Sequence, residues 1–268
     1  MSNNFQNVNL LKELYKDKDL IGLRGEFLKK YSNRRYSIRS FIVKYLLTDM
    51  KGFNIIDIGC GNGSFLNKLH GIYPKNNYYG LDIIENEYCR KFDFLNYKIY
   101  DGKDIPKYNI KFDFIFCMNM IYHIDDLKLF FSNVKQILKP KGKIIITTKS
   151  KYTFPVIEAT FKKIALKMKL KTSRFRDENK LCLENGMKKI NESFNPKKFN
   201  IKEYIMETQI FNDDKKELIK YILSTSRYNP NFANQKELLR YLNFWEEEIK
   251  DDIFIDKYKE VVFTISKL

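Results

Sequence analysis

Hydrophobic residues in the middle of the chain fall into short continuous runs separated by stretches with helical periodicity. Two such stretches, residues 64–73 and 125–139, repeat apolar residues every three or four positions. Continuous apolar strands that alternate with amphipathic helices are typical of a parallel sheet covered on both faces. The sequence therefore predicts a doubly wound α/β core. Its predicted strands are FNIIDIG (53–59), YYGLDII (78–84), NYKIYDG (96–102), FDFIFCMNM (112–120) and GKIIITTK (142–149).

The pattern differs on either side of this core. Residues 10–18 and a longer stretch from about Arg24 to Leu47 have helical spacing, so we expect an N-terminal helical arm over residues 1–50. Residues 51–268 are expected to form one domain with a helical cap insertion at about 212–250. Its later elements are predicted as a basic helix (156–171), a polar irregular segment (172–198), a strand (200–211), two helices (213–224 and 234–250) and a last strand (259–267).

A glycine-rich turn follows the first predicted strand. That strand ends in Asp57, and Gly59, Gly61 and Gly63 come next, before a helix. Glycines in such a turn allow the backbone to approach a ligand closely, where a side chain would block it. Asp82 ends the second strand, and a carboxylate at this position can accept hydrogen bonds from both hydroxyls of a ribose. The pair of signals predicts a nucleotide-like cofactor.

The spacing of this turn distinguishes two cofactor classes. Nicotinamide dehydrogenases carry GxGxxG, whereas this chain has GxGxG with Asp57 two residues before the first glycine. A carboxylate there would be unfavourable beside a pyrophosphate but suits a cationic group. The turn therefore disfavours a dinucleotide and favours a cofactor with a positive charge, with a cofactor-binding module that has lost turnover as a further alternative.

Five segments, taken together, identify a family resemblance. IIDIGCGNG, GLDII, IYDG, FDFIFCMNMIYHIDD and LKPKGKIIITT resemble, in order and spacing, the motifs of class I (Rossmann-like) S-adenosylmethionine-dependent methyltransferases, over roughly Gly52 to Lys149. The resemblance implies a mostly parallel seven-stranded sheet and a methyltransferase domain over residues 51–268. It also implies S-adenosylmethionine as the cofactor and S-adenosylhomocysteine as the product.

The resemblance further implies which residues hold the cofactor. Asp57 would bind the methionine amino group, Asp82 the ribose and Asp101 the adenine amino group. Asn119 and Met120, at the end of the fourth strand, would line the pocket. The complete predicted cofactor-binding set is Asp57, Gly59, Gly61, Gly63, Asp82, Ile83, Asp101, Gly102, Asn119 and Met120.

The segment after the fourth strand supplies the candidate catalytic residues, which are Asn119, Tyr122 and His123. His123 is placed to act as a general base, and Tyr122 to position the acceptor. Both residues are equally compatible with a structural role as a core contact or cap. Methyl transfer is an in-line displacement on an activated sulfonium, so alignment can supply most of the acceleration and a dedicated base is optional.

Charge gives the main indication of the substrate. The chain has 49 Lys and Arg against 33 Asp and Glu, a net charge of +16, and the excess lies in residues 22–44 (+6) and 141–176 (+10). Cations interleaved with aromatic rings suit the phosphates and bases of RNA, although a solvated lysine-rich helix face would look similar. The predicted RNA-binding set is Arg24, Lys29, Lys30, Arg34, Arg35, Arg39, Lys162, Lys163, Lys167 and Lys169.

The leading hypothesis is therefore methyl transfer to RNA, most of all ribosomal RNA or a ribosomal subunit. In this hypothesis, the substrate of the chain is similar to that of the ribosomal RNA methyltransferases of the antibiotic-resistance type. The alternatives are a small-molecule methyltransferase, whose C-terminal helices close over a natural product or metabolite, and an RNA-binding protein that retains the cofactor without turnover.

Two further features concern the cell compartment and metals. The four cysteines, Cys60, Cys89, Cys117 and Cys182, show no CxxC spacing, so we expect neither a disulfide framework nor a metal site. No segment approaches the roughly 18 apolar residues of a membrane span, and the first residues lack the pattern of a secretion signal. We expect a cytoplasmic protein without a membrane partner.

Overall fold

The computed structural model describes residues 19–100, 105, 108–170, 180–225, 228, 235–249 and 252–268. The helix predicted over residues 10–18 and the two cofactor residues Asp101 and Gly102 lie outside these described residues.

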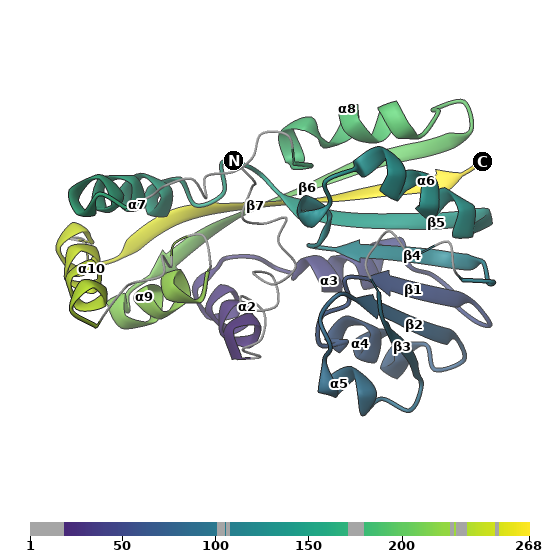
Figure 1. Cartoon of the computed structure of the whole chain (residues 1–268), viewed down its shortest axis with the longest axis horizontal. Helices are drawn as coiled ribbons and strands as arrows, with labels where there is room; N and C mark the ends of the chain where they lie inside the picture. The colour runs from purple at the N-terminus through teal and green to yellow at the C-terminus, as the bar shows by residue number, and fades with distance from the viewer. Residues whose placement is uncertain are drawn as a thin grey trace.

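A seven-stranded sheet with the order β3-β2-β1-β4-β5-β7-β6 forms the centre of the molecule (Figure 1). The neighbours from β3 to β5 pair in parallel, and β7 is antiparallel to both β5 and β6. The predicted doubly wound, mostly parallel sheet is confirmed. The strands are β1 (Asn54–Ile58), β2 (Asn77–Asp82), β3 (Leu95–Ile99), β4 (Phe112–Met118), β5 (Leu138–Lys149), β6 (Phe199–Asn212) and β7 (Phe254–Lys267).

Helices cover the sheet on both faces because successive strand residues point to opposite sides. Ile56 of β1 packs with α6 and α8 in one hydrophobic cluster, whereas its neighbour Ile55 packs with α3 and α4 in another. In Figure 1, α6 and α8 accordingly lie on one side of the sheet and α3, α4 and α5 on the other. These helices are α3 (Ile38–Phe41), which continues into a π-helical turn (Ile42–Leu46), α4 (Ser64–Ile72), α5 (Glu87–Arg90), α6 (Leu127–Ile137) and α8 (Leu183–Ser193).

Strands β6 and β7 extend beyond the rest of the sheet. They pair with each other along their whole length, from Phe199 opposite Lys267 to Asn212 opposite Phe254, but β5 pairs only with residues 260–266 of β7. The remaining part is a two-stranded ribbon, and four helices pack around it in a separate hydrophobic cluster. We call these helices the helical lobe (Figure 1). They are α2 (Asp19–Tyr31), α7 (Pro155–Met168), α9 (Lys215–Ser224) and α10 (Gln235–Glu248).

The helix predicted from about Arg24 to Leu47 is interrupted, so that prediction was wrong in its middle. Helix α2 ends at Tyr31, and Ser32 forms an isolated β-bridge with Ile210 of β6. The Asn33 amide donates to the Gln209 carbonyl over 3.1 Å, and the Gln209 amide donates to Asn33 Oδ1 over 3.0 Å. The open edge of β6 thus offers this segment hydrogen bonds that compete with helix formation.

The prediction of an irregular segment over residues 172–198 was also wrong, because α8 occupies residues 183–193. Its buried face comprises Gly186 and Ile190, with Leu183, Met187 and Phe194 beside them. This spacing is helical, but Lys and Asn residues between the apolar positions conceal it.

The described part of the chain holds no helix that is both long and apolar enough to cross a membrane. Its four cysteines are free thiols, of which Cys60, Cys89 and Cys117 are buried. Burial raises the pKa of the Cys117 thiol, so this side chain behaves as a small apolar core residue.

Candidate active site

A cavity of about 350 Å³ lies at the carboxyl ends of the parallel strands. The glycine-rich loop after β1, the end of β2 and the segment after β4 form its walls. Ligands bind at this edge of the sheet in open α/β folds. The lining residues are Arg24, Arg39, Ile58, Gly59, Cys60, Gly61, Asn62, Asp82, Ile83, Ile84, Asn86, Tyr100, Met118, Asn119, Met120, Tyr122, His123, Ile124 and Lys149.

The three glycines of the loop all have positive φ, but they are needed for different reasons. A Cβ atom on Gly59 would lie 2.6 Å from the Cβ of Met120, and one on Gly63 would lie 3.0 Å from the Sγ of Cys89. Around Gly61 there is open space within 4 Å. The protein's own packing therefore requires glycine at positions 59 and 63. At Gly61 the space is open, so this is the glycine that a ligand could approach closely.

Asp82 connects the second strand to this loop. Its Oδ2 accepts a hydrogen bond from the Gly61 amide over 2.7 Å, and its Oδ1 accepts one from the Ile84 amide over 3.0 Å. The carboxyl group is largely buried, and this burial raises its pKa. Asp82 thus fixes the loop and also lines the cavity.

Asp57 is buried directly before the lining residue Ile58. Its Oδ1 has no hydrogen-bond partner within the described residues, and burial raises its pKa to about 7 although the guanidinium of Arg39 opposes the shift. Arg39 itself lines the cavity and donates to the Ser64 hydroxyl over 2.8 Å. A buried carboxylate oxygen without a donor fits a ligand that brings one, such as an ammonium group.

The segment after β4 places the three predicted catalytic residues on the cavity wall. Asn119 has φ of +55°, which asparagine tolerates better than most residues, and its amide donates to the Thr147 Oγ1 over 2.9 Å. The Asn119 Oδ1 is buried and finds no hydrogen-bond partner among the described residues. The rings of Tyr122 and His123 follow, with centroids 4.5 Å apart.

His123 is neutral at physiological pH. Burial, with a contribution from the Lys180 charge, lowers the pKa of its imidazole to about 4. A neutral imidazole can donate or accept a hydrogen bond, but formation of the imidazolium is opposed here.

A family model described as a methyltransferase domain matches residues 31–193. The chain belongs to this methyltransferase family. The match begins at the end of α2 and includes the whole cofactor loop, the parallel strands and α8.

Curated relatives of this methyltransferase include two transfer RNA enzymes. The tRNA U34 carboxymethyltransferase of Campylobacter lari is 31% identical over 119 residues, which cover 41% of this chain and 40% of that protein. The enzyme of the same name from Nautilia profundicola is 30% identical over 121 residues, again covering 41% and 40%. The match thus spans about two fifths of the relatives' length.

Solved structures with the same fold contain the methyl donor or its product. The Haemonchus contortus phosphoethanolamine N-methyltransferase 2 with S-adenosylmethionine has a TM-score of 0.53 at 17% identity, covering 96% of this chain and 59% of that one. The plantazolicin methyltransferase BpumL with S-adenosylhomocysteine has a TM-score of 0.55 at 13% identity, covering 97% and 96%. At these identities the two structures show a shared fold, and the family match shows that the chain is a methyltransferase.

Part of the predicted RNA-binding set of the methyltransferase faces inward. Arg24 and Arg39 line the active-site cavity. The Nη1 of Arg34 lies 3.8 Å from the Oε2 of Glu260, whose carboxyl group is buried on β7 and also accepts from the Tyr258 hydroxyl over 2.9 Å. These three arginines therefore contribute to the interior and the cavity, which differs from the surface role that their sequence pattern suggests.

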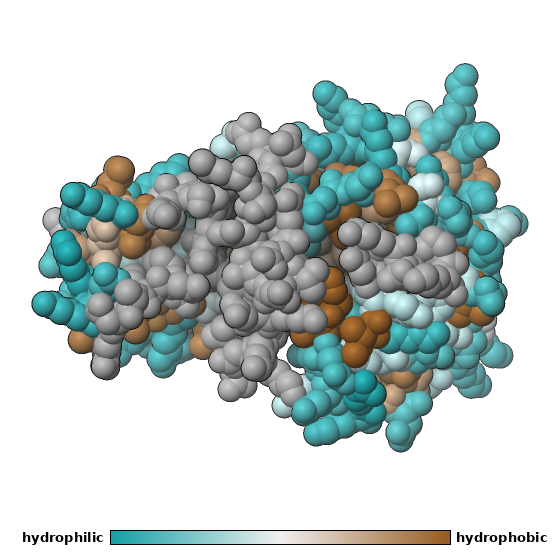
Figure 2. Space-filling view, viewed as in Figure 1, coloured by the Kyte–Doolittle hydropathy of each residue, from teal (hydrophilic) through white to brown (hydrophobic). Residues whose placement is uncertain are grey.

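The remaining members of the set lie on the outside. The Nζ atoms of Lys163 and Lys167 on α7 are 3.6 Å and 2.8 Å from carboxylate oxygens of Glu248 on α10. Figure 2 shows hydrophilic side chains at both ends of the molecule, over the core sheet and over the helical lobe. The other exposed cations of the set are Lys29, Lys30, Arg35, Lys162 and Lys169.

Sequence reasoning missed several lining residues of the cavity, among them Lys149 and Tyr100. Lys149 is the last residue of β5, and its Nζ lies 5.3 Å from the ring centroid of Tyr258. Tyr100 directly follows β3, and its amide donates to the Asp82 carbonyl over 2.9 Å. The signal for both was their place at the carboxyl end of an apolar run, where a parallel sheet presents side chains to ligands.

Within the described ranges, no group of three or more His, Cys, Asp or Glu side chains is arranged to hold a metal ion.

Proposed function

We propose that this methyltransferase acts on a small acceptor that carries an anionic group. The observation that carries the proposal is the presence of Arg24 and Lys149 on the wall of the cavity that also contains the glycine loop and Asn119. A carboxylate or phosphate on the acceptor would bind between these cations and hold the reacting atom in line with the methyl group.

The helical lobe supports this assignment because it fixes Arg24. Phe27, three residues further along α2, stacks on Tyr221 of α9 with ring centroids 4.3 Å apart. Helix α2 therefore packs against the lobe, and it brings a cation over the carboxyl ends of the strands. A concave site of about 350 Å³ whose wall carries placed cations suits a small molecule.

For the donor side, we propose that S-adenosylmethionine is the cofactor and that the following residues bind it. Asp57 accepts from the ammonium of S-adenosylmethionine, and Asp82 with Ile83 binds its ribose. Asp101 and Gly102, which lie outside the described residues, are assigned to the adenine. The bound cofactor supplies a methyl group activated by its sulfonium, so these residues need only orient it.

For the acceptor side, Asn119, Tyr122 and His123 are assigned to positioning by hydrogen bonds. The low pKa of His123 argues against a charged imidazolium in the reaction. Alignment of the acceptor by these groups and by Arg24 and Lys149 would then supply the rate acceleration. This assignment suits an acceptor atom that reacts without prior loss of a proton.

The second candidate is methylation of RNA. Two observations favour it: the curated relatives are named as transfer RNA enzymes, and Lys29, Lys30 and Lys162 belong to an exposed cationic set. Because those names specify transfer RNA, transfer RNA replaces ribosomal RNA in this proposal, and the names give no support to an antibiotic-resistance role. A transfer RNA substrate would also agree with the predicted cytoplasmic location.

Labelled methyl transfer separates the two candidates. The enzyme is incubated with S-adenosylmethionine carrying a tritiated methyl group and with a cell extract split into small molecules and RNA. We expect label among the small molecules. The double variant Arg24→Gln and Lys149→Gln should lose this activity, whereas Lys29→Gln with Lys30→Gln should keep it. Label in RNA that depends on the second pair and not on the first would overturn the small-acceptor proposal.

We also propose that residues 1–50 act as an N-terminal arm on a methyltransferase domain of residues 51–268, with the insertion at about 212–250 serving as a cap. The positions of α9 and α10 in the helical lobe support the cap.

A further inference from the structure

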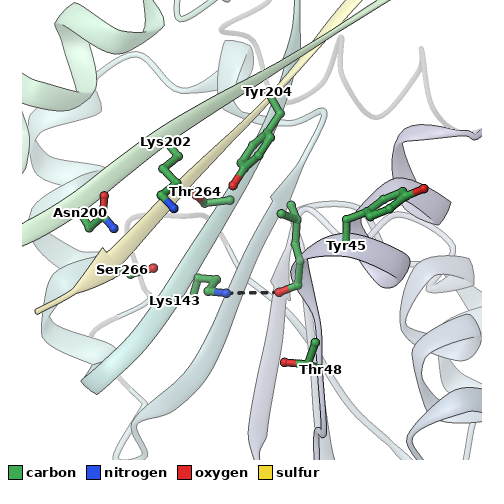
Figure 3. Close-up of a pocket in the computed structure, with 9 residues that line it drawn as sticks. Tyr45, Thr48, Lys143, Asn200, Lys202, Tyr204, Thr264 and Ser266 are labelled. Atoms are coloured by element: carbon green, nitrogen blue, oxygen red, sulfur yellow. Dashed lines mark hydrogen bonds between the residues drawn. The ribbon is translucent and has the colours of Figure 1, made fainter.

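A second cavity, of about 230 Å³, lies on the sheet at the opposite end of β5 from the active site (Figure 3). Lys149 at one end of β5 lines the active site, and Lys143 lines this second cavity. Six residues of strand separate the two positions by about 20 Å at roughly 3.3 Å per residue. The second cavity is therefore a separate place on the molecule. Its lining residues are Tyr45, Leu46, Thr48, Lys143, Asn200, Lys202, Tyr204, Thr264 and Ser266.

The strand register explains why these side chains meet. Lys143 of β5 lies opposite Ser266 of β7, and Lys202 of β6 lies opposite Thr264 of β7. Strand β7, which lies between β5 and β6, thus contributes two short hydroxyl side chains. Each of its two neighbouring strands contributes one lysine. Figure 3 shows the two lysines and the hydroxyl groups around one opening.

The lining carries positive charge without compensation among its own residues. It includes two ammonium groups and no carboxylate. The Nζ of Lys143 donates to the Leu46 carbonyl over 3.2 Å, which uses one of its three donors. Burial lowers the pKa of Lys143, and the nearby charge of Lys202 lowers it further. Two ammonium groups on the wall of one cavity repel each other, and an anion between them would relieve the repulsion.

We propose that this cavity binds a compact oxyanion, namely the phosphate group of a small phosphorylated ligand. The ammonium groups of Lys143 and Lys202 supply the charge, and the hydroxyl groups of Thr264 and Ser266, with the amide of Asn200, supply neutral donors on the same face. A phosphate oxygen accepts from both kinds of donor. The proposal is independent of the nature of the methyl acceptor.

The test is thermal unfolding of the full chain in sodium phosphate, in glycerol phosphate and in sodium chloride at equal ionic strength. With a Kd on the order of 1 mM, 20 mM phosphate should raise Tm by about 3–5 °C above the chloride value. Lys143→Met and Lys202→Met should each remove most of this increment. Lys188→Met, at an exposed position on α8, is the matched control and should keep it.

A further variant guards against a change in stability caused by the lysine substitutions themselves. Thr264→Val preserves the shape and the net charge, and it should reduce the phosphate increment while leaving the chloride baseline near that of the wild type. The proposal fails if phosphate and chloride have equal effects, or if the lysine variants keep the full increment. Stabilisation by an oligoribonucleotide but by neither phosphate compound would also overturn the proposal, because the cavity would then bind an RNA backbone.

Discussion

The proposed ammonium-binding role of Asp57 predicts that the affinity for S-adenosylmethionine depends on pH. Because burial raises the pKa of Asp57 to about 7, the carboxyl group is half ionised at pH 7 in the free protein. A bound ammonium would return this pKa towards the ordinary value of about 4. Lowering the pH from about 7 to about 5.5 reduces the ionised fraction from about one half to about one thirtieth, so Kd should rise about 15-fold.

Isothermal titration between pH 5.5 and 7 measures this effect. The range keeps the ammonium of the cofactor charged, since an α-amino group titrates near pH 8. Asp57→Asn should remove the pH dependence and weaken binding at pH 7 by about 10- to 100-fold, the value of a hydrogen bond to a charged group. Asp82→Asn is the matched control, and its remaining affinity should still depend on pH.

The stability of the free protein should respond to pH in the opposite sense through the same group. A carboxyl with a raised pKa stabilises the fold in its protonated form, and this contribution disappears as the pH rises through about 7. Acid should therefore weaken cofactor binding before it unfolds the protein. A Kd that stays constant from pH 7 to pH 5.5, or a slope that persists in Asp57→Asn, would refute the role of this carboxylate.

Three further changes test the site and the fold. Asp82→Ala should weaken cofactor binding by about 10- to 100-fold, because it removes both the proposed ribose acceptor and the anchor of the glycine loop; unchanged affinity in calorimetry would contradict this. His123→Gln should lower kcat by less than about tenfold, whereas a loss of about 10²- to 10⁴-fold would identify a general base. Gly186→Ala should destabilise the protein by about 1–3 kcal/mol in urea unfolding, because its Cβ would lie 2.3 Å from the Cζ of Phe263. Gly71→Ala, with open space around it in α4, is the control and should be neutral or stabilising by up to about 1 kcal/mol.

The parallel core could be predicted from the sequence because its strands are buried on both faces. Ile55 and Ile56, for example, face opposite sides of the sheet and are both fully buried, so neighbouring positions of their strand are apolar. The glycine-rich turn could also be predicted, since Gly59, Gly61 and Gly63 all have positive φ, a conformation that glycine adopts readily.

The start of β7 was missed because its alternation is unusual. Asp256 is buried and Ile255 is exposed, which is the reverse of the expected pattern. The reason is distant in sequence: the Asp256 carboxylate accepts from the amides of Val156 and Ile157 at the start of α7, over 3.2 Å and 2.9 Å. A strand residue that caps a helix 100 positions earlier leaves no local signal.

For the same reason, the sequence could not show which basic side chains face the interior of the protein. Net charge located an excess around Arg34 and Arg39, but their partners are Glu260, more than 200 residues away, and the active-site cavity. Charge counting shows where cations are abundant, and only the fold shows which of them face inward.

The ribbon formed by β6 and β7 has a mechanical consequence. Enzymes whose two parts are joined by a loop can open by rotation about that loop, but here the connection is a ladder of hydrogen bonds between two strands. A large rotation of the helical lobe against the sheet would have to bend or twist this ribbon. Helix α2 adds a second connection, because the chain directly after it is hydrogen-bonded to the edge of β6 at Ser32 and Asn33. The hydrogen bonds of both connections therefore oppose an opening of the cavity by movement of the whole lobe.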